Sequence, residues 1–309
     1  MSFVRIRILN FDDSVTRQKR LLADYDAEII DMRDLGPGAR FWMNRGVASK
    51  IEKRLPSRPT RTVTFLGSGD FHNVTDMLIS RYDEPICVID FDFHPDWDIL
   101  FPMPHCGSWA ARAMRRPNVL KLIMLGVSSR DLLPFSIHTG DLGSLKDDRI
   151  EIYPYSQKPA YVFLRRVPQN ISIATTRYPF VTKILWNGLK DKNITEFLLH
   201  IIKRLPSKKV YVTVDKDCLR ADYALTNWEE GAFSLDDLLV MLKILKDNLD
   251  IVGMDITGDY SAIQLAGIFK RFASYLDHTK RLKASELALS RIDEINERTN
   301  LKILELINS

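Results

Sequence analysis

The sequence predicts an α/β protein, a three-layer α/β/α sandwich around a mainly parallel central sheet. Strand-like and helix-like segments alternate along most of the 309 residues, as they do in sheets covered by helices on both faces. The run at residues 85–90 is almost continuously apolar, which is typical of a strand buried on both faces. Acidic and histidine residues gather directly after several predicted strands, where parallel sheets bind their ligands. We expect one domain over residues 1–309, with a helical extension over 290–309.

The individual elements follow from hydrophobic periodicity. Alternating apolar residues and short apolar runs predict strands at residues 3–9, 27–31, 61–66, 85–90, 119–126, 209–214 and 251–255. Apolar residues at helical spacing predict helices at residues 16–25, 46–54, 73–81, 105–114, 193–205, 235–249, 261–289 and 290–309. Ser234 is the expected N-cap of the helix at 235–249. Residues 128–189 are irregular, with short β-like pieces at 149–153, 161–165, 171–174 and 182–185.

The composition favours a soluble globular protein. Its 45% hydrophobic and 27% charged residues are ordinary for that class, and a net charge of +4 is too small to indicate nucleic acid. No apolar run is long enough to span a membrane, and the N-terminus has no signal-peptide pattern, so we expect no membrane partner. Three widely spaced cysteines favour reduced thiols and a cytoplasmic location. The apolar stripe at 291–307 fits either a homo-oligomer contact or a helix folded onto the body.

The residues after the strand at 85–90 predict a metal site. In an extended segment alternate side chains point the same way, so Asp92, His94 and Asp96 can converge on one point. Carboxylate oxygens and a neutral imidazole suit Mn²⁺, Zn²⁺, Fe²⁺ or Ni²⁺. Aromatic residues alternate with these charges, which indicates partly buried carboxylates, and such groups are costly to bury without a cation.

A second acidic pair follows the strand at 209–214. Asp215 and Asp217 share a face and could close the cage that the first cluster opens. Lys216, between them, is expected to point away and to act as a counter-charge. A helix cap or a turn would explain one of the two aspartates but not the pair.

Several segments, in this order, resemble the arginase, agmatinase and deacetylase superfamily. Asp92-Phe93-His94-Pro95-Asp96 fits the D-x-H-x-D motif of that superfamily, and Asp215-Lys216-Asp217 fits its second D-x-D motif. His105-Cys106-Gly107 is similar to its histidine-containing loop, and residues 125–131 resemble a later strand-to-loop signature. Gly253-Met254-Asp255-Ile256 resembles its last-strand motif G-L-D-I. The agreement covers roughly residues 62–259, about two-thirds of the chain.

The resemblance implies a divergent arginase-like hydrolase with two metal ions, for which Mn²⁺ is the first choice. Asp92 would bridge the two ions, His94 would bind one of them and Asp96 the other. Asp215 and Asp217 would complete the pair, with Asp215 bridging. Water acidified by the ions would attack a planar carbon and break a C–N bond in a guanidine, amidine or amide. Asp96 is the implied proton shuttle. His105 would line the cleft with a proton-transfer role, or alternatively would only cap its helix.

The sequence departs from the family pattern at two places. The family's first metal histidine follows G-G-D directly, whereas here one residue intervenes and the histidine is His72. Either His72 still binds metal, which we favour, or Asp70 replaces it. In addition, a glycine stands where guanidine-cleaving relatives have a glutamate, which argues against ordinary arginase or agmatinase activity. Glu229, Glu230 and Asp259 are the candidates to bind substrate instead.

Two alternatives remain beside the binuclear hydrolase. A single-metal, deacetylase-like hydrolase with Zn²⁺ or Fe²⁺ keeps the fold, and the number of ions per chain separates it from the first interpretation. A non-catalytic arginase-fold binding protein is the other alternative, because the first histidine is displaced and the glutamate is missing.

Overall fold

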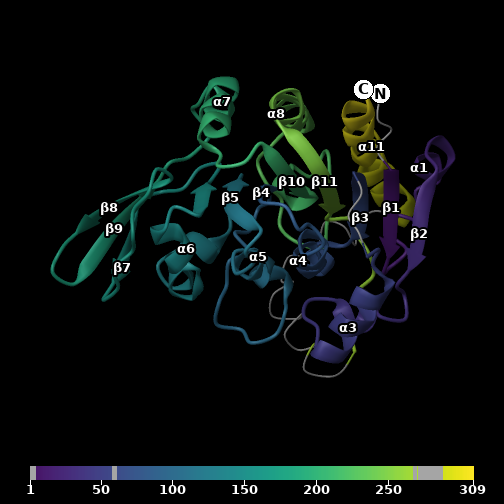
Figure 1. Ribbon diagram of the computed structural model, residues 1–309, viewed down its shortest axis with the longest axis horizontal. Helices are drawn as coiled ribbons and strands as arrows, with labels where there is room; N and C mark the ends of the chain where they lie inside the picture. The colour runs from purple at the N-terminus through teal and green to yellow at the C-terminus, as the bar shows by residue number, and fades with distance from the viewer. Residues whose placement is uncertain (1–4, 58–60, 267–269, 271–287) are drawn as a thin grey trace.

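An eight-stranded sheet forms the centre of the molecule (Figure 1), in a computed structural model that describes residues 5–57, 61–266, 270 and 288–309. Its strands lie in the order β2-β1-β3-β11-β10-β4-β5-β6, and every neighbouring pair is parallel. Their bounds are β1 Arg5–Asn10, β2 Ala27–Asp31, β3 Thr62–Gly67, β4 Ile86–Phe91, β5 Val119–Leu125, β6 Ile150–Tyr153, β10 Lys209–Asp215 and β11 Asp250–Thr257. The predicted fold class is confirmed.

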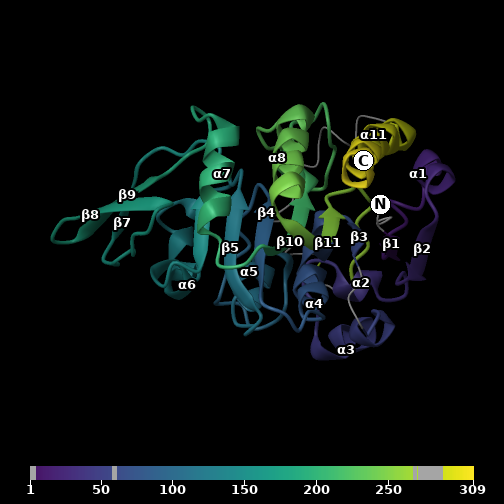
Figure 2. The ribbon, with the colours of Figure 1, turned by 45° about the horizontal axis from the view of Figure 1, so that its top comes forward.

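Helices cover both faces of this sheet (Figure 2). One layer consists of α1 Lys19–Asp24, α7 Ile194–Arg204, α8 Leu235–Asn248 and α11 Leu289–Asn308. The other consists of α2 Gly36–Ala39, α3 Arg45–Arg54, α4 Thr75–Ile79, α5 Trp109–Ala113 and α6 Leu142–Lys146. Successive residues of β4 point into the two layers in turn: Val88 packs in one core, Cys87 and Ile89 in the other. Burial on both faces explains why this strand is apolar throughout.

A second, smaller sheet extends away from the end of the molecule next to β6 and α6 (Figures 1 and 2). It consists of β7 Ala160–Phe163, β8 Ile173–Arg177 and β9 Val181–Trp186, which pair antiparallel in the order β7-β9-β8. We call residues 160–186 the β-arm. The short β-like pieces expected in this part of the sequence are thus confirmed, and all but β6 belong to the arm.

Some helix predictions hold and others need correction. The capping box of Ser234 and Asp237 begins α8 as expected, and the terminal helix is confirmed as α11, whose apolar face packs into the core beside α8 and α1. The helices expected at 73–81 and 105–114 are shorter, because 3-10 turns at Gly69–Val74 and Cys106–Ser108 precede α4 and α5.

The helix expected at 261–289 is wrong over residues 261–266, which form no regular structure. Polar contacts hold the chain there: the Ser261 hydroxyl accepts from Arg40, and its backbone bonds the Asn227 side chain. Residues 267–269 and 271–287 of that predicted helix lie outside the described residues, and its last residue, Leu289, already belongs to α11. Among the helices that the structure describes, none has the length and apolar character needed to cross a membrane.

Candidate metal centre

Three strands, β3, β10 and β4, bring the predicted ligands to one edge of the sheet, and β11 lies between β3 and β10. Because these neighbouring strands are parallel, their carboxyl ends meet there. The turn after β3 carries His72, the segment after β4 carries Asp92, His94 and Asp96, and β10 ends in Asp215 with Asp217 two residues on; every one of these side chains except His94 is buried.

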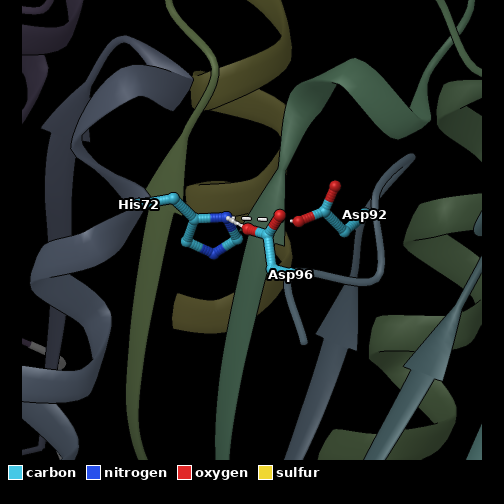
Figure 3. A group of neighbouring side chains, drawn as sticks. All are labelled: His72, Asp92 and Asp96. Carbon is cyan, nitrogen blue, oxygen red and sulfur yellow. Dashed lines mark ion pairs between the residues drawn. The ribbon is translucent and has the colours of Figure 1, made fainter. Parts of the chain in front are cut away.

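His72, Asp92 and Asp96 form the first of two groups that could hold a metal ion (Figure 3). The Nδ1 atom of His72 lies 3.2 Å from Asp92 Oδ2, 3.2 Å from Asp96 Oδ2 and 3.7 Å from Asp215 Oδ2. Neither His72 Nδ1 nor Asp92 Oδ2 has a hydrogen-bond partner among the described residues. Unpartnered buried atoms of this kind, gathered around one point, fit a cation ligand set.

Three further side chains fix the protonation of the His72 ring. The Thr213 hydroxyl lies 2.9 Å from His72 Nε2 and donates its only hydrogen to Asp255 Oδ1 over 2.5 Å. Tyr211 donates to the other Asp255 oxygen over 2.7 Å. Since the Thr213 oxygen must therefore accept from His72, the hydrogen of the neutral ring sits on Nε2. The Nδ1 lone pair is left facing the three carboxylates, as a metal ligand requires.

Asp92, His94 and Asp217 form the second group and share Asp92 with the first. His94 Nδ1 lies 3.0 Å from Asp217 Oδ2 and 3.7 Å from Asp92 Oδ1, while its Nε2 lies 3.4 Å from Glu229 Oε2. The backbone N–H of Phe93 donates to the remaining Asp217 oxygen. The second histidine thus repeats the arrangement of the first: Nδ1 faces the carboxylates and Nε2 faces an outer partner.

The carboxylates crowd one another in the absence of a cation. Burial, followed by the charge of Asp92, raises the pKa of Asp96 to about 7 and that of Asp217 to about 6. Burial and then the charges of Asp217 and Asp92 raise the pKa of Asp215 well above its ordinary value. Burial alone would raise the pKa of Asp92 too, but contacts with the two histidines more than offset it and lower that pKa. A divalent cation would relieve this repulsion.

The ligands reach these places by a route that strand alternation did not predict. β4 ends at Phe91, so Asp92, His94 and Asp96 follow the strand instead of extending it. Asp96 has a left-handed backbone, with φ of 43°, which turns its carboxylate toward His72, while His94 joins the other group. The three side chains therefore do not meet at one point, as strand alternation alone suggested; they divide between two groups that share Asp92, which is the division that the resemblance implied.

Two glycines make room for the Asp215 carboxylate. A Cβ on Gly69 would lie 2.7 Å from Asp215 Oδ2, and one on Gly258 would lie 2.5 Å from Asp215 Oδ1. Gly258 also has a φ of 89°, which side chains other than glycine rarely adopt. The position where guanidine-cleaving relatives have a glutamate therefore has no space for a side chain here.

A pocket of about 310 Å³ opens onto the ligands. All the predicted ligands except His72 line it, and His72 lies buried behind them. Phe41 and Trp228 stack on one wall, with ring centroids 5.6 Å apart and an angle of 8° between the planes. His105 and Glu229 also line the pocket, as expected from the sequence. Its remaining residues include Asp98, Ser129, Arg130, Asp131 and Thr139.

Three other sequence candidates lie elsewhere. Asp70, the alternative to His72, is buried against Arg40 at 2.6 Å and belongs to neither ligand group. Asp259 does not line the pocket: it is 1% exposed and accepts from Lys216 at 2.7 Å, so we no longer expect it to contact substrate. This pair does confirm that Lys216 points away from the ligands. Glu230 is exposed and does not line the pocket either.

Sequence reasoning overlooked the Thr213–Asp255–Tyr211 relay and the aromatic wall. The signal for the relay was available, since Tyr211, Thr213 and Asp215 alternate along one strand and so share a face. A threonine among valines in a fully buried strand needs a hydrogen-bond partner. No comparable signal pointed to Trp228, which stands in an irregular loop.

The fold and the site together define a class: an α/β/α protein with a carboxylate–histidine centre at the carboxyl ends of its parallel strands. Comparison with known proteins identifies the family within this class, because residues 23–258 match the model of the arginase family. The chain belongs to the arginase family.

Individual relatives are distant. An uncharacterized protein of Thermotoga maritima is 26% identical over 257 residues, which cover 82% of this chain and 79% of that protein. The arginase of Entamoeba histolytica, solved with L-ornithine, superposes with a TM-score of 0.56 at 12% identity over 99% of both chains. The formimidoylglutamase of Bacillus subtilis gives a TM-score of 0.55 at 13% identity, over 99% of this chain and 87% of that one. At such identities the solved structures support the fold alone.

Proposed function

We propose that this protein is a metal-dependent hydrolase that cleaves a C–N bond and uses two divalent ions, with Mn²⁺ as the preferred metal. One observation carries the proposal: two ligand groups share Asp92, and each contains a histidine whose Nδ1 is directed at carboxylates. His72, Asp92, Asp96 and Asp215 would hold one ion; Asp92, His94, Asp215 and Asp217 would hold the other. Ions bound there would polarise the substrate and acidify water.

The chain's own residues would move the protons. Asp96 lines the pocket and lies beside the ligand cluster, so its carboxylate can take a proton from the attacking water and pass it to the leaving nitrogen. His105 Nε2 has no hydrogen-bond partner among the described residues and lies 3.7 Å from Asp98 Oδ2. Burial lowers the pKa of His105, which keeps the ring neutral and available for proton transfer. His105 is also the N-cap of the 3-10 turn Cys106–Ser108, in a capping box with Ser108, whose hydroxyl accepts from the His105 backbone N–H.

The charge of the pocket favours a cationic substrate. Four ligand carboxylates balance two divalent ions, and the other charged lining residues are Asp98, Asp131, Glu229 and Arg130, which leave a net charge of minus two. An amidinium or guanidinium group suits such a pocket better than a neutral amide does. Asp215 fills the space beside Gly258, so a glutamate at that position could not bind the substrate cation. Glu229, which lines the pocket, is the proposed substrate-binding carboxylate instead.

The single-metal alternative has one observation in its favour, since Asp92, His94 and Asp217 form a complete group without His72. Elemental analysis of protein purified without chelators separates the two. Two ions per chain, together with hydrolysis of an amidine or guanidine panel that Asp92→Asn abolishes, would support the proposal. One ion would favour a deacetylase-like mechanism, and no ion after dialysis against Mn²⁺ would refute both. His105→Asn should lower kcat while metal content stays unchanged.

A further inference from the structure

The β-arm and the chain on either side of it are unusual in charge. Residues 152–190 contain six lysines and arginines and no aspartate or glutamate. The whole chain carries a net charge of +4, so the remainder of the molecule has a net charge of minus two. A positive segment of this kind on a negative body is an electrostatic feature that a partner of opposite charge can recognise.

The end of the β-arm is apolar and exposed. Phe163, Leu164, Tyr178 and Phe180 are 64%, 85%, 55% and 72% exposed. They lie together, because the Leu164 N–H donates to the Phe180 carbonyl over 2.9 Å and Phe163 pairs with Val181, whose carbonyl accepts from Tyr178. We call these four exposed residues the apolar tip. Soluble proteins seldom expose such a contiguous patch unless it contacts something.

Basic side chains surround the apolar tip. Arg177 pairs with Thr182 in the antiparallel register, and the Thr182 hydroxyl donates to the Arg165 carbonyl, which places both arginines beside the tip. Arg166 follows Arg165 directly. These three arginines, which we call the basic collar, are exposed and make no ion pair with any residue that the structure describes. Their charge is therefore free to act on a partner.

We propose that the β-arm docks the protein on an anionic lipid surface. In this arrangement the apolar tip enters the boundary between headgroups and acyl chains, and the basic collar contacts lipid phosphates. The sequence-based expectation of no membrane partner depended on the lack of a spanning segment, and surface docking needs none.

Other partners fit the β-arm less well. A symmetric contact between the arms of two copies would bring two positive segments together, which is unfavourable. Single-stranded nucleic acid would use the cations and the aromatic rings, but it gives no role to Leu164, the most exposed apolar residue of the tip. An apolar end with a cationic collar matches a lipid interface in both respects.

The test is sedimentation of the full chain with phosphatidylcholine vesicles and with vesicles containing 30% phosphatidylserine. Wild type should bind the anionic vesicles and not the neutral ones. The collar variant Arg165→Gln/Arg166→Gln/Arg177→Gln should bind them about 100-fold more weakly, at roughly fivefold per cation near the surface. Leu164→Ser, a change at an 85% exposed side chain, should weaken binding severalfold with an unchanged thermal midpoint.

The matched control is Lys243→Gln/Arg291→Gln/Lys302→Gln, which removes three exposed cations from the helices of the body and leaves the arm intact. It should bind anionic vesicles like wild type. Equal loss in the control and collar variants would overturn the proposal, as would equal binding to neutral vesicles. Two further outcomes would reassign the arm: a dimer that Leu164→Ser dissociates without vesicle binding, or collar-dependent RNA binding without vesicle binding. The arm contributes no residue to the pocket or the ligand groups, so metal content should be the same in all variants.

Discussion

Replacing Thr213 by valine tests the hydrogen-bond relay behind the metal centre. Valine has nearly the same shape, so Thr213→Val removes a hydroxyl from a side chain that is 0% exposed without leaving a cavity. His72 Nε2–H then loses its acceptor, and Asp255 Oδ1 loses its donor. The ring can turn over or change its tautomer, and Nδ1 is no longer held toward Asp92 and Asp96.

The expected size of the effect follows from that geometry. Loss of an outer partner of a metal-binding histidine lowers metal affinity by roughly 10- to 100-fold, or about 1.4–2.7 kcal/mol. The unpaired buried groups should also lower the free energy of unfolding of the metal-free protein by about 1–3 kcal/mol. Thr213→Ser keeps the hydroxyl and loses one methyl group, which costs about 0.8 kcal/mol of stability and should leave metal affinity close to that of wild type.

The assay is competition for Mn²⁺ against a fluorescent chelator at pH 7.5, with circular dichroism to check folding. If two binding steps are resolved, only the one that involves His72 should weaken in Thr213→Val, because the His94 group uses Glu229 as its outer partner. Equal affinities for the valine and serine variants would refute the reasoning, since they differ in the hydroxyl that the relay requires.

Three more predictions concern the same centre. His72→Ala should reduce metal content from about two ions per chain to about one, whereas His200→Ala, at an exposed histidine on α7, should not; two ions in the first variant would contradict the assignment. Gly258→Glu restores the residue type of guanidine-cleaving relatives, yet it should lose metal and gain no guanidine hydrolysis, because its Cβ would lie 2.5 Å from Asp215 Oδ1; guanidine turnover with full metal content would show this wrong. Without metal, Asp96 and Asp217 have raised pKa values of about 7 and about 6, so the folded state holds their protons more tightly than the unfolded state does. The resulting stability is fully present at a pH below the ordinary aspartate pKa and is lost as the pH rises through 6 and 7. The melting temperature in EDTA should therefore fall between pH 5 and 8, less so in Asp96→Asn and with Mn²⁺ present; a rise over that window in EDTA would contradict it.

Local pattern in the sequence was sufficient to predict the fold class and to select most of the candidate ligands. A strand buried on both faces leaves an unbroken apolar run, and parallel strands leave their ligands at the carboxyl ends, so both features can be read from β4 and β10. The role of His72 could not be decided in this way. Its place depends on the 3-10 turn Gly69–Val74, in which Phe71 stacks on Phe11 and Asp70 binds Arg40, leaving the histidine directed at the ligands.

The division of the ligands into two groups was also beyond local pattern. It requires the left-handed backbone of Asp96, a conformation that a non-glycine residue adopts only where its surroundings impose it. Asp259 lies away from the pocket because it pairs with Lys216, and the two residues meet only because β10 and β11 are neighbours in the sheet. Such contacts between distant segments leave no periodic trace in the sequence.

The strand order has a consequence for how the protein is made. β3 and β4 leave the ribosome early, yet β10 and β11 separate them in the finished sheet, although both are synthesised more than a hundred residues later. A nascent chain that ends before β10 therefore lacks the middle of its sheet, and Asp92 cannot meet Asp215 or Asp217. When the two late strands insert between the two early ones, they form contacts between residues far apart in the sequence, and such contacts are expected to form slowly. Metal capture would then be among the last events of folding, and a released fragment without β10 and β11 would expose the edges of β3 and β4.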